Sequence, residues 1–429
     1  MKKKYRIILY TSIFLLCVVA SIILVVKKSN SVYEEESKPK VVKHKSMLSM
    51  NSEQTAGAGD YKTVTQSSWP TEGYKFNAEL SRCENGSTLS WDDTKKAVIV
   101  SGNLSDKCYV YFDIYQPTLA EYIKSQYTGT QGENNIYYHD SDLANGAGDN
   151  SYRYAGANPN NFVCFGSDTS PCPTDNLYRI IGVFGENYHG VTGKQLVKLI
   201  KYDYMTTDEL GTDGDYSQTY KEWGMDSTYK GTYGDGERIG VYYWNYKATG
   251  SATNTWSTSL LNKTNLNTNF INNIGTTWAN KIATVTWKVG GNTYANISDV
   301  VPATTYQNEI VNPVTTNTTD NATTYSAKIG LMYVSDYGFA ASPDAWTLTM
   351  SSYNNTTATN NNWMYMGLYE WTISRDAFYS YFAFFVGSGG LVSSYGVYSD
   401  YGVRASFSLE SSVSYVSGSG SMSDPIVIN

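Results

Sequence analysis

The chain opens with an unbroken apolar run that covers residues 7–26. A helix of about 20 apolar residues is long enough to cross the hydrocarbon core of a bilayer. Four basic residues precede the run, two follow it, and three glutamates come soon after, at positions 34–36. Because basic residues stay on the cytoplasmic side, this pattern predicts a transmembrane anchor over residues 1–28, with the rest of the chain outside the cell membrane. A cleaved signal peptide is the alternative, but its apolar region is usually shorter, about 7–15 residues.

The pattern changes twice between this anchor and residue 116. Residues 29–66 are polar and contain few large apolar side chains, which is typical of a flexible stalk. Residues 67–115 then contain two short runs of β-branched and aromatic residues, at 97–100 and 108–112. Such runs favour β-strands. We therefore expect a stalk over 29–66, followed by a small β unit over 67–115.

Residues 116–429 form the larger part of the chain and mix both periodicities. An apolar run predicts a strand over 177–184. An apolar residue at every fourth position predicts one stripe of an amphipathic helix, formed by Leu266, Phe270, Ile274, Trp278 and Ile282. Further strands are expected over 283–289, 328–334, 345–350 and 363–371, and an Asn/Thr-rich surface loop over 311–325. The order of strand, helix and then many strands predicts the α+β class.

Composition and charge narrow the class of protein. The chain has 39 Tyr but only 32 Lys and Arg, and this polar, weakly charged composition is typical of exported β-rich proteins. An AT-rich genome would produce a similar bias. The net charge is −7, although the first 28 residues are basic, so the remainder is more acidic still. Since phosphate contacts need clustered Lys and Arg, the charge argues against nucleic acid and against anionic lipid as partners.

Four cysteines lie in the part of the chain that we expect outside the cell. Cysteines in an oxidising compartment usually pair, and four of them allow three pairings. The simplest pairing is local, with Cys83 bonded to Cys108 and Cys164 bonded to Cys172. A structural zinc site is the rival interpretation. Its ligands are usually spaced as CxxC, which none of these cysteines are, and the chain has only three His.

We find no motif for catalysis, for a metal or for a cofactor. The G-x-S-x-G, Walker A and H-E-x-x-H patterns are absent from the sequence. Two acidic stretches, at 140–142 and 213–215, begin like a calcium loop. Their fifth positions hold Ala144 and Ser217, where a calcium loop needs Asp or Asn. The sequence therefore predicts solvated turns at these places, and a protein that is not an enzyme and needs no cofactor.

Four segments follow one another in the C-terminal third: Glu-Trp-Thr-Ile-Ser-Arg at 370–375, Gly-Val-Arg at 402–404, Phe-Ser-Leu at 407–409 and a Ser/Gly-rich end at 416–428. This order resembles the closing segment of bacterial C-type-lectin-like domains. The resemblance covers residues 155–429. The fold is shared with formylglycine-generating enzymes, with variable proteins of diversity-generating retroelements, and with surface proteins of gut Firmicutes and Mollicutes. The resemblance implies a C-type-lectin-like domain over 116–429, in which Trp371 and Arg404 belong to the structural frame.

Two activities of that family do not carry over to this chain. Formylglycine-generating enzymes need a cysteine pair near the C-terminal end of the fold, and no cysteine follows Cys172. Calcium-dependent lectins carry Glu-Pro-Asn or Gln-Pro-Asp followed by Trp-Asn-Asp, and these motifs are absent here. The resemblance therefore implies a scaffold that displays a binding surface to a protein or cell-surface ligand.

The segment 376–401 is the expected binding surface. It is rich in Tyr, Ser, Phe and Gly and contains no Lys, Glu, Gln, Met or Trp. Retroelement diversification would leave that signature, because it randomises adenines in Asn codons, and Tyr with Ser and Gly also suits a binding surface. The expected ligand-binding residues are Tyr379, Tyr381, Tyr395, Tyr398, Ser399, Asp400 and Tyr401. Three alternatives stay open: rings that cap the core, a structural envelope protein without a pocket, and an extracellular glycan-active enzyme.

Overall fold

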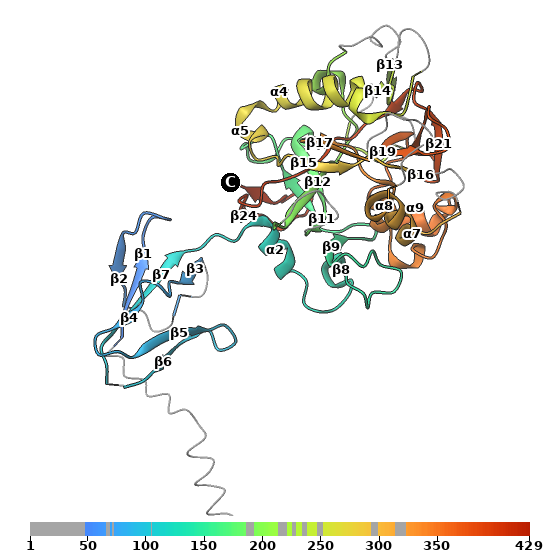
Figure 1. The fold of residues 1–429 in the computed structure, drawn as a ribbon. Helices are drawn as coiled ribbons and strands as arrows, with labels where there is room; N and C mark the ends of the chain where they lie inside the picture. The colour runs from blue at the N-terminus through green and yellow to red at the C-terminus, as the bar shows by residue number, and fades with distance from the viewer. Residues whose placement is uncertain are drawn as a thin grey trace, which may run out of the picture. The chain divides into compact units, whose positions relative to one another are not determined.

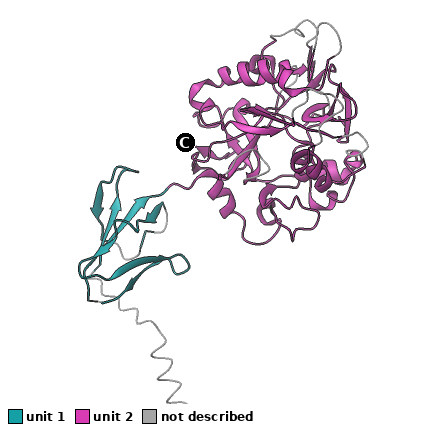
Figure 2. Cartoon of the chain, in the orientation of Figure 1, with its two compact units in different colours: residues 1–115 teal, residues 116–429 magenta. Residues whose placement is uncertain are grey.

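The computed structural model describes residues 48–65, 69–70, 73–103, 105–185, 193–212, 221–224, 229–233, 238–246, 252–292, 299–313 and 323–429. The chain divides into two compact units, residues 1–115 and 116–429 (Figure 2). The predicted anchor over 1–28 lies outside the described residues. Among the residues that are described, no helix is long and apolar enough to cross a membrane.

The first unit is a small β structure built around one long central strand, β7 (Cys108–Ile114). The strands pair in the order β2-β1-β7-β3, and β4 also pairs with β7. A separate hairpin joins β5 to β6. Met50, Val110 and Phe112 form the buried core of the first unit. The remaining strands are β1 (Leu48–Glu53), β2 (Tyr61–Thr63), β3 (Tyr74–Phe76), β4 (Arg82–Cys83), β5 (Thr88–Asp92) and β6 (Ala97–Ser101).

The first two strands fall in the range that the sequence suggested as a stalk. Residues 48–53 instead pair in parallel with β7, and residues 61–63 pair with β1. The reason lies in Met50, which is only 7% exposed and packs in the core of the unit. A single buried apolar side chain among polar neighbours gives no alternating pattern, so the strand could not be recognised from the sequence.

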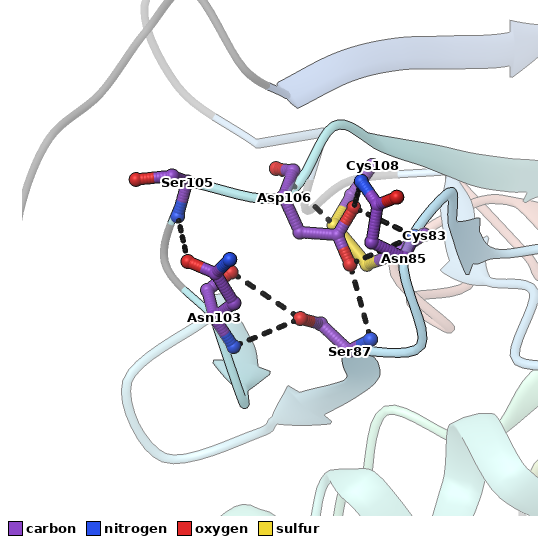
Figure 3. Close-up of a disulfide and its surroundings, with 7 residues drawn as sticks. All are labelled: Cys83, Asn85, Ser87, Asn103, Ser105, Asp106 and Cys108. Carbon is purple, nitrogen blue, oxygen red and sulfur yellow. Dashed lines mark hydrogen bonds between the residues drawn. A yellow bond between two sulfur atoms is a disulfide. The ribbon is translucent and has the colours of Figure 1, made fainter.

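The disulfide between Cys83 and Cys108 joins directly paired residues of β4 and β7 (Figure 3). Beside it, the carboxylate of Asp106 accepts hydrogen bonds from the backbone N–H groups of Asn85 and Ser87, at 2.9 and 3.1 Å. These bonds hold the chain as it leaves the bridge. The second bridge joins Cys164 to Cys172 in the larger unit. Both predicted disulfides are therefore confirmed.

The larger unit is built on two seven-stranded sheets (Figure 1). The first has the order β18-β23-β12-β11-β9-β8, with β10 also pairing with β11. Its centre is β11, in which all eight residues are buried, as the apolar run over 177–184 predicted. The strands are β8 (Ile136–His139), β9 (Ser151–Tyr154), β10 (Phe162–Cys164), β11 (Leu177–Phe184), β12 (Leu196–Lys201), β18 (Ile329–Gly330) and β23 (Ser406–Ser408).

The second sheet carries the predicted binding segment. Its order is β13-β14-β22-β19-β20-β21, and β16 pairs with β19. The strands are β13 (Lys221–Gly224), β14 (Arg238–Tyr242), β16 (Gly291–Asn292), β19 (Glu370–Asp376), β20 (Phe382–Val386), β21 (Val392–Gly396) and β22 (Tyr401–Gly402). Two further pairs are formed by β15 (Val285–Lys288) with β17 (Thr324–Ala327) and by β24 (Tyr415–Ser417) with β25 (Val427–Ile428).

Short helices cover the sheets. One of them, α8 (Val334–Ala340), contacts β9 of the first sheet and both β19 and β20 of the second. The others are α2 (Leu119–Ser125), α3 (Thr207–Leu210), α4 (Ile271–Asn273), α5 (Gly275–Ala279), α7 (Pro302–Tyr306) and α9 (Thr356–Asn360), with the π-helical η4 (Leu261–Phe270) and η5 (Gln307–Val311). Five 3₁₀ turns are η1 (Glu133–Asn135), η2 (Thr174–Asn176), η3 (Trp256–Thr258), η6 (Pro343–Ala345) and η7 (Met350–Ser352).

The predicted apolar stripe lies on a broken helical segment, η4, α4 and α5, rather than on one regular helix, and its last residue, Ile282, follows α5 in an isolated bridge with Leu409. Leu266, Phe270, Trp278 and Ile282 of the stripe are buried in the main core. A π-helix has more residues per turn than an α-helix because its hydrogen bonds join residues five apart. A spacing of four therefore stays on one side of this segment for longer than it would on an α-helix.

One predicted strand does not form, and another forms only at its last two residues. Residues 345–350 lie between the turns η6 and η7, where Pro343 begins a 3₁₀ turn and the indole of Trp346 donates to the carbonyl of Ala341 at 2.9 Å. Residues 363–369 are irregular, and β19 begins only at Glu370. There, Gly367 has a φ of +98°, which excludes a regular strand at that position. Residues 345–350 alternate apolar and polar side chains as a strand does, and residues 363–369 are apolar without alternation, so both patterns favoured strands that the local turns exclude.

The predicted α+β class is wrong, because the structure is mostly β-sheet with only 20% of its residues in helices. Some of the helical segments, such as η4 and α9, are rich in Asn and Thr, which are weak helix formers. The transmembrane helix named with that class also finds no support among the residues that the structure describes.

Candidate functional site

Exposed aromatic side chains gather in one stretch of the second sheet. Six aromatic residues between 369 and 398 are 39–62% exposed, and no other described aromatic residue reaches that exposure. We call these six residues the aromatic patch: Tyr369, Phe378, Tyr379, Tyr381, Tyr395 and Tyr398. Four of them, Tyr379, Tyr381, Tyr395 and Tyr398, are among the predicted binding residues.

A rigid turn presents three of these rings between β19 and β20. The buried carboxylate of Asp376 accepts hydrogen bonds from the backbone N–H groups of Phe378 and Tyr379, at 2.7 and 3.0 Å. The side-chain amide of Asn254, which is also fully buried, donates to the carbonyl oxygens of Asp376, Tyr379 and Phe382 at 2.7–3.0 Å. These two buried side chains hydrogen-bond to the backbone of the turn. The backbone that carries Phe378, Tyr379 and Tyr381 is therefore held in place without a ligand.

The hairpin between β20 and β21 presents the next ring. Tyr395 pairs across the sheet with Ala383, which is fully buried, and its ring stacks near Phe382 with the ring centroids 6.2 Å apart. The hairpin turns at Gly390, whose φ is +94°. A side chain there would also come within 2.7 Å of the carbonyl oxygen of Tyr353, so the turn requires glycine.

Tyr398 lies over a glycine on the same edge of the sheet. A Cβ atom added to Gly396 would come within 2.7 Å of Cζ of Tyr398, which shows that the ring covers this backbone position. Gly396 pairs with Phe382 in β20. Ring contacts then run from Phe378 to Tyr379 and Tyr381, and through Phe382 to Tyr395. Four of the six patch residues are thus linked by ring contacts in which Phe382 takes part.

Tyr401 differs from the other predicted tyrosines, since its ring is half-buried. The ring lies 4.5 Å from Trp371 and 4.9 Å from Phe385, and it stacks on Tyr369 at 5.2 Å. Burial, with the neighbouring Tyr369 and Tyr395, raises the pKa of Tyr401 to about 12. Tyr401 therefore joins the core residues Trp371 and Phe385 to Tyr369 of the patch.

The predicted polar residues Ser399 and Asp400 lie at the end of the patch and are half-buried. The carboxylate of Asp400 pairs with the amino group of Lys221 at 3.3 Å. The other charged groups between 369 and 401 are Glu370, Arg375 and Asp376, and all three are buried. The patch is therefore nearly uncharged, and ring contacts and phenol hydroxyls dominate what it offers to a ligand.

Trp371 and Arg404, which were predicted to belong to the frame, lie in the core beneath the patch. The indole of Trp371 is fully buried and donates to the carbonyl of Tyr242 at 2.8 Å. The guanidinium of Arg404 binds both carboxylate oxygens of Glu370 at 2.8 and 2.9 Å. It also donates to the carbonyl of Met364 at 2.7 Å. Neither side chain reaches the surface.

Three residues of the site were not predicted. Tyr369 lies outside the segment 376–401 and was missed, although it stands two positions before Trp371 in the same strand region. Phe378 is the most exposed of the described aromatic residues at 62%, and it lies in the segment 376–401 but was not among the expected binding residues. Asn254 lies more than 100 residues away in sequence, and no local signal indicates its contact with the turn.

The acidic stretch at 140–142 forms a turn. The carboxylate of Asp140 accepts from the backbone N–H groups of Asp142 and Leu143 at 3.1 and 3.0 Å. The second stretch, at 213–215, lies outside the described residues. Within the described part of the chain, no group of three or more His, Cys, Asp or Glu side chains is arranged to hold a metal ion.

Comparison with known protein families, curated proteins and solved structures finds no match for this chain.

Proposed function

We propose that this protein is an extracellular binding protein that recognises a protein or another cell-surface ligand through the aromatic patch. The observation that carries the proposal is the confinement of all exposed described aromatic residues to positions 369–398. Exposed rings grouped on one surface are unfavourable in water, and such groups usually mark interaction sites.

The rigidity of the patch supports the same proposal. Asp376 and Asn254 fix the turn that carries three of the rings. A surface that is ordered before binding loses less conformational entropy when a ligand arrives. Tyr contributes large contact area with few rotatable bonds, which is why it is common in binding surfaces.

The location outside the cytoplasm is part of this proposal. Two disulfides, Cys83–Cys108 and Cys164–Cys172, support it, because structural disulfides are rare in reducing compartments. The nearly uncharged patch and the acidic chain favour a ligand that is recognised by shape and aromatic contacts rather than by charge.

The test is binding of the fluorescently labelled full chain to intact bacterial and epithelial cells, measured by flow cytometry. The variant Tyr395→Ser with Tyr398→Ser removes two rings that are 54% and 52% exposed, and we expect it to lose at least tenfold in affinity, or about 1.4 kcal/mol. The control variant is Val416→Ser with Met422→Ser, which removes two side chains that are 46% and 41% exposed in the same unit but outside the patch.

The control should bind as the unmodified chain does. Pretreatment of the cells with protease distinguishes a protein ligand from a glycan or lipid. If the patch variant and the control bind equally well, or if the unmodified chain binds none of these cells, the proposal is refuted.

A further inference from the structure

A lysine and an aspartate meet in the interior of the larger unit, far from the aromatic patch in sequence. The amino group of Lys198, on β12, lies 2.5 Å from Oδ2 of Asp336, on α8. Both side chains are almost completely buried, at 4% and 1% exposure. They are 138 residues apart in the chain. Their contact connects a central strand of the first sheet to the helix that also touches the second sheet.

Aromatic rings surround the amino group. Nζ of Lys198 lies 4.4 Å from the ring centre of Tyr333 and 5.3 Å from that of Trp287. The ring of Phe184 is 5.9 Å away. Burial in this apolar environment lowers the pKa of Lys198, although Asp336 acts in the opposite direction. The neutral amine, which is the nucleophilic form of lysine, therefore costs less free energy to form here than in water.

The carboxyl group of Asp336 has one further hydrogen-bond donor and one cation beside it. The backbone N–H of Tyr333 donates to Oδ2 at 3.0 Å. Nη1 of Arg153 lies 3.9 Å from Oδ1. This nitrogen makes no hydrogen bond among the described residues. A buried cation beside Oδ1 stands where negative charge would develop if a nucleophile attacked the carboxyl carbon.

Burying an ion pair of this kind has a large desolvation cost, and the attraction between the two charges recovers it only in part. An amide bond between the same two side chains would remove both charges from the interior. It would still leave a carbonyl oxygen at the position of Oδ1, facing Arg153.

We propose that Lys198 and Asp336 condense to form an intramolecular isopeptide bond. A proton first moves from Nζ to Oδ2, which converts the ion pair into a neutral amine and a carboxylic acid. The lone pair of Nζ then attacks Cγ of Asp336, and the negative charge develops on Oδ1 beside Arg153. A proton passes from the nitrogen to the Oδ2 hydroxyl, the Cγ–Oδ2 bond breaks, and one water molecule leaves. The step needs no oxidant, reductant or other reactant.

The bond would close a loop of more than 100 residues and would tie β12 to α8. A cross-link over a loop of that length removes conformational freedom from the unfolded chain. Such a covalent tie suits a domain that works outside the cell, where unfolded chains are not rescued by chaperones. The inference does not depend on the aromatic patch or on any ligand.

The test is peptide mapping of the full chain after reduction of its disulfides and digestion with trypsin. Trypsin does not cleave after a lysine whose amino group is in an amide bond. We expect cleavage after Lys194 and Lys201 but not after Lys198, so that residues 195–201 remain joined to residues 329–375. The joined species should weigh less than the sum of the two peptides by the mass of one water, about 18 Da.

Two variants separate an isopeptide bond from a simple ion pair between the same side chains. Lys198→Arg keeps the positive charge but removes the nucleophilic amine, and we expect it to release residues 329–375 as a free peptide. Lys201→Arg is the matched control, since Lys201 is also buried in β12 and pairs with Glu209 at 2.8 Å. This control should retain the joined peptides. If the unmodified chain yields the separate peptides with cleavage after Lys198, the contact is an ion pair only and the proposal is overturned.

Discussion

Arg404→Ala is expected to destabilise the larger unit strongly, without any direct effect on the aromatic patch. The guanidinium of Arg404 makes two hydrogen bonds to the carboxylate of Glu370 and a third to the carbonyl of Met364. Arg404 and Glu370 have side-chain exposures of only 1% and 2%. Removing the arginine therefore leaves a buried carboxylate and a buried carbonyl oxygen without their donor.

The magnitude follows from the cost of an unpaired buried charge. Breaking a buried ion pair by removal of one partner typically costs about 3–5 kcal/mol. For a domain of this size, the melting temperature falls by roughly 2 °C for each kcal/mol. We therefore expect Arg404→Ala to lower the melting temperature by about 6–10 °C.

The loss of stability caused by Arg404→Ala should also depend on pH. Burial raises the pKa of Glu370, and Arg404 acts against this shift in the unmodified protein. Without the arginine, Glu370 takes up a proton more readily, and a neutral carboxyl group is less costly to bury. The destabilisation by Arg404→Ala should consequently be smaller at acidic pH than at neutral or alkaline pH.

Differential scanning calorimetry of three variants tests this reasoning. The surface control Arg238→Ala should melt within about 1 °C of the unmodified protein, since surface substitutions rarely change stability by more than about 0.5 kcal/mol. The double variant Arg404→Met with Glu370→Leu should recover most of the loss, because it removes both charges together. If Arg404→Ala melts like the surface control, or if the double variant is no better than the single one, the buried pair does not stabilise the fold in this way.

Three further predictions follow from individual contacts. Replacing both Cys83 and Cys108 by Ser should destabilise the first unit by about 3 kcal/mol, seen as faster proteolysis within residues 48–115 while the larger unit stays intact. Burial, with Arg153 nearby, lowers the pKa of His139 well below 6.5, so the stability that its neutral form contributes is lost as pH falls below 6.5. In denaturant titrations, the free energy of unfolding of His139→Gln should therefore decrease less on acidification than that of the unmodified protein. Asn254→Ala removes three hydrogen bonds from the turn at 376–382. The variant should lose more free energy of ligand binding than free energy of unfolding, which cell-binding and denaturation measurements on the same variant check.

Features that depend on local sequence could be predicted. The strand β11 matches the apolar run at 177–184, and both disulfides join cysteines that are close in sequence. Four of the predicted tyrosines are exposed in the aromatic patch. Each of these features leaves its mark within a window of about 25 residues or fewer, where pattern and spacing are informative.

Features that depend on distant contacts could not be predicted. The strand β1 forms because its residues pair with β7, 60 positions away in sequence, and its own pattern shows only one buried apolar side chain. Tyr401 was expected on the surface with its neighbours. It is half-buried because Trp371 of β19 and Phe385 of β20 pack against its ring, and neither of these strands is the one that carries Tyr401.

The buried charges show why such contacts matter most for chemistry. In the sequence, Lys198 and Asp336 look like ordinary surface residues, and charged side chains are seldom fully buried unless they are paired. Only the fold shows that Lys198 and Asp336 are both buried and that they contact each other among aromatic rings. A lysine among the apolar residues of a strand, such as Lys198 in β12, is therefore informative even before its partner is known, because the interior must supply a group that offsets its desolvation. In this chain the group is the carboxylate of Asp336, which lies at hydrogen-bonding distance from the amino group. The proposed reactive site is therefore in the core, where a search limited to surface residues would miss it.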